Sequence, residues 1–179
     1  FNDAAKRTAL VNRVLAGGKV WVEGGEVGYK YRKSSTGADL DPVFRRTVLH
    51  DSLWQSDVSS STLGFIVPAH PIFNTPNTLT SPISFTGTSI YARDAMRMQP
   101  GDVGAQKLAG WSAYPDTAGI MMWADNGNQT TMFTMFAFGA IADTNNGKKL
   151  AQNIAAYLVG AGGGGASGPW LSINPTAGT

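Results

Sequence analysis

The chain has no cysteine among its 179 residues, so it contributes no disulfide, no thiolate metal ligand and no cysteine nucleophile. Charge is also scarce, since Lys, Arg, Asp and Glu together make up only 15% of the residues. No cluster of basic residues alternates with aromatic ones, which argues against nucleic-acid binding because phosphate contacts need a dense basic surface. No apolar run approaches the ~18–20 residues of a membrane span.

What the chain does contain is enough apolar sequence for a core and many turn residues. Apolar residues make up 42%, with 22 glycines and 9 prolines. This composition predicts one globular domain rather than a disordered chain. The low charge, the abundance of small polar residues and the lack of cysteine are typical of secreted bacterial proteins. We therefore expect a secreted, extracellular or cell-surface location.

Three segments carry helix signals, namely a polar N-cap and an apolar stripe or an N-terminal proline. These segments are residues 2–16, 41–50 and 143–159. Short runs of β-branched and aromatic residues predict strands between them. The predicted strands are residues 19–23, 63–67, 83–85, 106–111, 119–123 and 131–138, with a hairpin turn at 125–128. The alternation of helices and strands predicts the α/β class.

A glycine-rich turn directly follows the first predicted strand. Its residues Gly24, Gly25, Glu26 and Gly28 fit the G-x-nucleophile-x-G elbow, which exposes its central residue above an α/β sheet. A carboxylate at the centre can act as an acid, a base or a ligand. Two interpretations stay open: Glu26 has such a chemical role, or the glycines form a tight turn whose backbone N–H groups hold Glu26.

His50 and His70 are the only histidines, and either could pair with Glu26 in acid–base chemistry. The candidate catalytic residues are therefore Glu26, His70 and His50, and none is assigned a catalytic role outright. Each histidine has a purely structural alternative. Their spacing does not match HExxH, so no zinc site is expected.

The sequence indicates no cofactor and only a weak alternative of Ca²⁺ binding. The pairs Asp39/Asp41 and Asp51/Asp57 could supply carboxylates, although helix caps and solvated loops also explain them. Residues 125–128 lack the alternating ligands of a calcium loop. Four tryptophans at strand-like positions predict core packing, with a sugar-binding platform as the alternative. They are Trp21, Trp54, Trp111 and Trp123.

Several segments together resemble a known family. Residues 9–29, ALVNRVLAGGKVWVEGGEVGY, resemble the central helix, strand and elbow of class I glutamine-amidotransferase-like domains, in the variety found in secreted bacterial proteins. Four later segments are similar to the same family. They are 48–54 (VLHDSLW), 69–76 (AHPIFNTP), 136–143 (FAFGAIAD) and 153–158 (NIAAYL). The resemblance implies a flavodoxin-like three-layer sandwich with a mainly parallel sheet, incomplete at its N-terminal side.

In this reading residues 1–159 form the later part of such a domain, and the function follows from its elbow. Catalytic members of the family carry a cysteine where this chain has Glu26. We therefore predict a non-catalytic structural or assembly module of a secreted multidomain protein. The alternatives are a hydrolase-like enzyme that uses Glu26 with a histidine, and a carbohydrate- or surface-binding domain.

The C-terminal part predicts a link to another module or another chain. Residues 160–169 read as a glycine-rich linker, and residues 170–179 resemble the opening strand of a BACON-like β-sandwich repeat. Trp170, Leu171, Ser172 and Ile173 could instead add as a strand to the sheet edge of a neighbouring copy. The expected partners are therefore copies of this chain, other protein chains or the N-terminal part of its parent.

Overall fold

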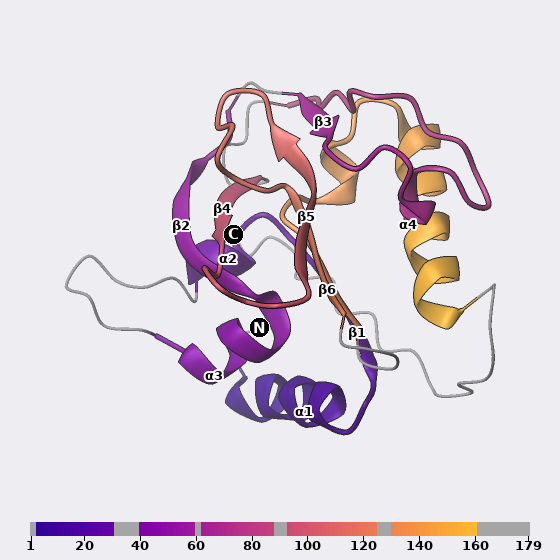
Figure 1. Ribbon diagram of the computed structural model, residues 1–179. Helices are drawn as coiled ribbons and strands as arrows, with labels where there is room; N and C mark the ends of the chain where they lie inside the picture. The colour runs from indigo at the N-terminus through magenta and orange to yellow at the C-terminus, as the bar shows by residue number, and fades with distance from the viewer. Residues whose placement is uncertain (1–2, 31–39, 60–61, 88–92, 125–129, 161–179) are drawn as a thin grey trace.

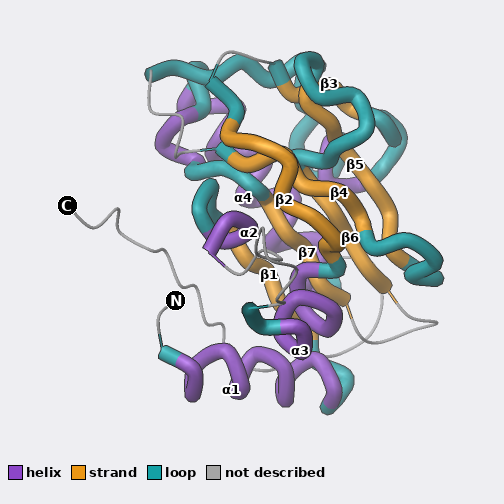
Figure 2. Tube along the Cα trace, turned by 90° about the vertical axis from the view of Figure 1, so that its left-hand side faces the viewer, coloured by secondary structure: helices purple, strands orange, loops and turns teal. Residues whose placement is uncertain are grey.

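The main structural element is a five-stranded sheet. The computed structural model describes residues 3–30, 40–59, 62–87, 93–124 and 130–160. The sheet has the order β1-β7-β6-β5-β3, and Figure 2 shows these strands in that order from bottom to top. Its strands are β1 (Lys19–Glu23), β3 (Leu63–Phe65), β5 (Ala105–Trp111), β6 (Ile120–Ala124) and β7 (Thr130–Thr134). A separate antiparallel sheet pairs β2 (Asp51–Asp57) with β4 (Asp94–Met98).

The predicted flavodoxin-like sandwich with a mainly parallel sheet is wrong. Only β1 and β7 are parallel, and every other pair in the main sheet is antiparallel. The reason lies in the connections, because β5, β6 and β7 follow one another after short links that cannot carry a parallel crossover. The opening helix, strand and elbow look like part of a βα repeat, but no further repeat follows among the described residues.

The helices begin and end close to where the sequence predicts them. α1 (Ala4–Leu15) is capped by Asp3, and α4 (Thr144–Val159) is capped by Asp143 and ends at Gly160. The predicted helix 41–50 consists of α3 (Pro42–Phe44), capped by Asp41, and the π-helical turn η1 (Arg45–Leu49). Three short helices complete the described chain: α2 (Val27–Lys30), η2 (Pro71–Phe73) and η4 (Phe138–Ala140).

The main sheet separates two apolar cores, with α4 on one side and β2 and α3 on the other (Figure 1). The two-residue period of the strands distributes side chains between them. In β1, Val20 and Val22 face the core that contains α1, while Trp21 packs toward the core that contains α4. In β7, Phe133 and Met132 divide in the same way. β1 is thus covered on both faces.

One further predicted strand is not formed, and several predicted segments lie outside the described residues. Residues 83–85 form only isolated bridges, Leu63 with Ile83 and Phe85 with Ile141, rather than a strand. The hairpin turn at 125–128, Asp39, residues 161–169 of the linker and the donor strand Trp170–Ile173 lie outside the described residues. Among the described helices, none is long and apolar enough to cross a membrane.

Candidate functional site: a cluster of three carboxylates

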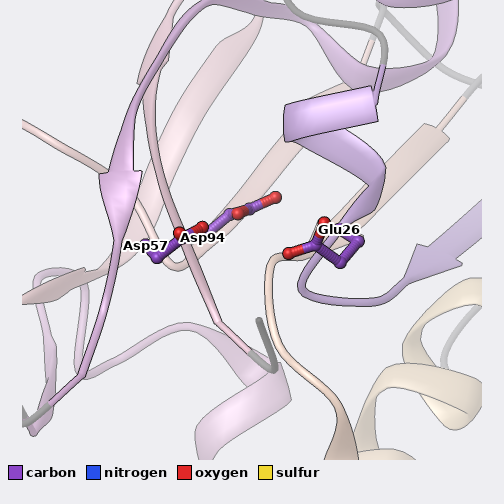
Figure 3. A group of neighbouring side chains, drawn as sticks. All are labelled: Glu26, Asp57 and Asp94. Carbon is purple, nitrogen blue, oxygen red and sulfur yellow. The ribbon is translucent and has the colours of Figure 1, made fainter. Parts of the chain in front are cut away.

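Three acidic side chains from distant parts of the sequence meet at one place (Figure 3). Glu26 lies in the turn after β1, Asp57 ends β2 and Asp94 begins β4. One carboxylate oxygen from each lies within 4.8 Å of the other two. The antiparallel register places Asp57 directly opposite Asp94, and Figure 3 shows Asp94 between Asp57 and Glu26. The cluster therefore joins the main sheet to the small sheet.

The predicted elbow is a tight turn whose geometry favours glycine at position 24. Gly24 has φ of 142°, a conformation that L side chains rarely adopt, and its N–H donates to the Thr134 carbonyl. Gly28 lies in α2, and a Cβ on it would lie 2.4 Å from the Met96 sulfur, so the start of α2 packs closely on β4. These two glycines hold Glu26 against the strand that carries Asp94.

Asp94 is the buried member of the cluster, with 0% of its surface exposed. Its Oδ1 accepts a hydrogen bond from the Trp54 indole at 3.0 Å, and its Oδ2 accepts one from the Tyr29 backbone N–H at 3.1 Å. Burial raises the pKa of Asp94 well above its ordinary value. The two hydrogen bonds oppose this rise in pKa, and the nearby carboxylates Glu26 and Asp57 add to it.

Among the described residues, Asp57 has a buried carboxylate oxygen that lacks a hydrogen bond. Its Oδ1 is buried and has no hydrogen-bond partner within the described ranges. Burial also raises the pKa of this carboxyl group. A buried carboxylate oxygen without a partner is costly and calls for a proton or a cation. The same need follows from three carboxyl groups packed together, since like charges this close cannot all stay ionised without compensation.

Two aromatic rings lie beside the cluster. Trp54 and Tyr29 meet edge to face, with ring centroids 4.9 Å apart, and both are partly exposed. Tyr114 approaches from β5's side and donates to Ser56 Oγ at 3.2 Å. The carboxylate cluster therefore has partly exposed aromatic side chains beside it.

The histidines proposed as partners of Glu26 are not members of this cluster. His50 Nδ1 lies 2.6 Å from Asp102 Oδ2, and its ring stacks on Trp123. Burial lowers the pKa of His50, against the opposing effect of Asp102. His70 Nδ1 accepts from the Ile72 N–H at the start of η2, and its ring contacts Tyr157. The structure thus gives each ring structural contacts of its own.

Asp51 and Asp57, the weak alternative for a shared Ca²⁺ site, do not lie together. Asp51 lies at the opposite end of β2 and contacts the Arg45 guanidinium. Asp41 caps α3, and its Oδ2 accepts a hydrogen bond from Arg7 Nε at 2.6 Å. Of the tryptophans, Trp111 is a core residue with 1% exposure, whereas Trp54 lies at the site.

Sequence reasoning singled out Glu26 and Asp57 but missed Asp94 and Tyr29. Residues 93–98 show no clean alternation of polar and apolar side chains, so the strand that begins at Asp94 left little signal. The glycine-rich turn was the one usable signal in the sequence, because it marks Glu26 and Tyr29 as neighbours of a strand end.

Comparison with known proteins found no matching family model, no matching curated protein and no matching solved structure. The resemblance to glutamine-amidotransferase-like domains therefore stays a prediction.

Proposed function

We propose that this chain is a non-catalytic structural module of a secreted protein and that Glu26, Asp57 and Asp94 bind a divalent cation, Ca²⁺ in particular. The observation that carries the proposal is the buried Asp57 Oδ1, which has no hydrogen-bond partner among the described residues and lies in a cluster of three carboxylates. A cation supplies the missing partner and offsets the mutual repulsion of the three groups.

The size of that repulsion supports a bound cation. Two unit charges 4 Å apart repel by about 4 kcal/mol near a protein surface. A proton on Asp94 removes part of this energy, as the raised pKa indicates, but leaves Glu26 and Asp57 as two carboxylates in the same cluster. A divalent ion interacts favourably with all three carboxylates at once.

The chemistry of the ligands favours a hard cation. All three are carboxylates, and no histidine belongs to the cluster. Ca²⁺ binds oxygen ligands at about 2.3–2.6 Å, so oxygens on opposite sides of the ion stand about 5 Å apart. A spread within 4.8 Å fits this range. The hydrogen bonds from Trp54 and Tyr29 to Asp94 orient a ligand carboxylate as supporting groups do at metal sites.

A bound cation at this position has a structural consequence. Glu26 belongs to the turn that leaves β1 of the main sheet, while Asp57 and Asp94 close one end of the small sheet. The ion therefore ties the two sheets together, and its binding free energy adds to the free energy of unfolding.

Calorimetric titration of the EDTA-treated protein with CaCl₂, followed by thermal unfolding, tests the proposal. We expect one site, with affinity in the range of extracellular calcium modules, about 10⁻⁴–10⁻³ M. At free Ca²⁺ about one hundred times the dissociation constant, stability should rise by about 2.7 kcal/mol. In a domain of this size the midpoint should rise by about 5–10 °C.

Asp57→Asn is the informative variant, because it removes a ligand charge while nearly preserving side-chain size. We expect at least tenfold weaker Ca²⁺ binding and a much smaller thermal shift. Asp116→Asn makes the same change at an exposed loop position and should bind Ca²⁺ like the unaltered chain. An unaltered chain that shows no Ca²⁺-dependent shift, or an Asp57→Asn variant that keeps it, contradicts the proposal.

The partly exposed Trp54–Tyr29 pair supports a second candidate, a carbohydrate-binding or hydrolase-like site. Aromatic faces stack on sugars, and neighbouring carboxyl groups bond hydroxyls or carry out acid–base hydrolysis. A glycan array followed by Glu26→Gln separates the alternatives. Sugar binding that is lost in Trp54→Ala supports a binding module, and hydrolysis that is lost only in Glu26→Gln supports an enzyme.

A further inference from the structure

The outer edge of β1 has the structure of an interior strand but lacks a neighbour on one side. β7 pairs with β1 in parallel, and no other described strand pairs with it. Val20 and Val22 are 6% and 2% exposed beneath α1, while Trp21 packs edge to face on Phe138 on the opposite face. Strands covered on both faces normally have a neighbour at each edge.

The backbone groups at this edge can be identified. The Gly24 N–H donates to Thr134 in β7, and the Val22 carbonyl accepts from the Thr134 hydroxyl at 3.4 Å. Backbone groups of successive strand residues point to alternate sides of the strand. The N–H and C=O groups of Val20, Val22 and Gly24 therefore point toward β7. The N–H and C=O groups of Lys19, Trp21 and Glu23 therefore point away from β7. Within the described part of the chain, no backbone hydrogen bond satisfies them on that side.

We propose that two copies of this chain pair through β1, antiparallel, around a two-fold axis at Trp21. In this register Lys19 lies opposite Glu23 of the second copy, and Val20 lies opposite its Val22. Lys19, Trp21 and Glu23, whose backbone groups point away from β7, are then opposite one another in the two copies. Each of them forms hydrogen bonds to the second copy through both its N–H and its C=O group. The two main sheets join into one continuous sheet.

The charges of KVWVE favour a second copy in this orientation over other occupants. Each Lys19 ammonium meets a Glu23 carboxylate, and the symmetry produces this pair twice. Parallel pairing in register would instead place Lys19 beside Lys19 and Glu23 beside Glu23. Glu23 Oε1 accepts from the Phe138 N–H, which fixes the carboxylate on the face that Lys19 shares. The Glu23 carboxylate can accept hydrogen bonds from the Phe138 N–H and from the Lys19 ammonium of the second copy at the same time.

Zero-length carbodiimide crosslinking provides the decisive measurement. Residues 19 and 23 of one strand stand about 13 Å apart, since a strand rises about 3.3 Å per residue. A direct amide between Lys19 and Glu23 can therefore form only between two chains. We expect this crosslinked peptide in the dimer band and, by light scattering, a mass twice the 18.9 kDa of one chain. A chain that is monomeric at about 100 μM, or a dimer without this crosslink, overturns the proposal.

Charge variants provide an independent test. Lys19→Glu places two carboxylates opposite each other at both ends of the pair and should raise the dimer dissociation constant at least tenfold. The double variant K19E/E23K restores opposite charges and should recover most of the affinity. Lys148→Glu, at an exposed position of α4, is the matched control and should leave the constant unchanged.

Glu23 also accepts a hydrogen bond from the Phe138 N–H, so the double variant could fail to fold. Glu23→Gln is the variant to use in that event. It keeps an acceptor for the Phe138 N–H, removes the charge and should weaken the dimer severalfold. A dimer equally stable in Lys19→Glu, Glu23→Gln and the unaltered chain would overturn pairing through β1.

Discussion

The two ends of β2 place acidic residues in opposite electrostatic situations. At its start, Asp51 is fully buried and the Arg45 guanidinium lies 3.3 Å from its Oδ1. The same arginine donates to the carbonyls of Asp51 and Ser52. At its end, Asp57 faces two further carboxyl groups, and one of its oxygens has no hydrogen-bond partner in the described chain. A compensated acid stabilises a fold, whereas a buried carboxylate oxygen without a partner points to a ligand.

Arg45→Met should produce the largest effect, because it removes the compensation at the start of β2. Asp51 then stays buried without its cation, which typically costs about 3–5 kcal/mol. Urea unfolding followed by tryptophan fluorescence measures this loss. Arg97→Met, on the exposed side of β4, should change stability by about 0.5 kcal/mol or less. A comparable loss in both variants would show that the Arg45 contact has no special role.

The second largest effect should be the pH dependence of stability, which arises from the carboxyl groups at the end of β2. Asp94 keeps its proton in the folded state at pH values at which the unfolded chain has released it, because its folded pKa is raised. The calcium-free protein should therefore be most stable near the ordinary carboxyl pKa of about 4 and lose stability as pH rises through the folded pKa. Burial raises the pKa of Asp57 in the same direction.

Urea unfolding in EDTA at a series of pH values measures this slope, and saturating Ca²⁺ should reduce or reverse it. Asp116→Asn is the control and should leave the slope unchanged. Stability of the calcium-free protein that rises steadily from acid to neutral pH would contradict the assignment of the proton to Asp94.

Asp57→Asn should have the smallest effect on stability and the most specific one, because its sign depends on calcium. Without the ion, the change removes one member of a repelling cluster and should be neutral or stabilising by up to about 1 kcal/mol. With saturating Ca²⁺ it should be destabilising relative to the unaltered chain, because the ligand is lost. Paired thermal melts with EDTA and with Ca²⁺ test this reversal. A loss of the same size under both conditions would indicate a packing defect.

The sequence was sufficient for the parts of the fold that local signals determine. Asp3, Asp41 and Asp143 mark helix starts, and KVWVE is a strand by composition. The parallel sheet was wrong because short connections, and not propensities, decide strand direction. β2 and β4 were missed for a different reason: their register shifts between Asp51 and Leu53 and between Trp54 and Ser56, and such irregularities disrupt a two-residue pattern.

The candidate site was therefore only half predictable. Glu26 was found because a glycine-rich turn is a local feature, whereas Asp94 reaches it only through the pairing of two irregular strands. Asp57 was named with the wrong partner, since Asp51 and Asp57 occupy opposite ends of one strand. Long-range register is the information that spacing along the sequence does not contain.

β1 is connected to both proposals, because its edge is the proposed dimer interface and the turn that follows it holds Glu26. Ca²⁺ binding and pairing would therefore share one short segment and are open to thermodynamic linkage. Whatever factor Ca²⁺ contributes to the affinity between copies, pairing must contribute the same factor to the affinity for Ca²⁺. If that factor differs from one, the assembly state of the protein would respond to changes in calcium concentration.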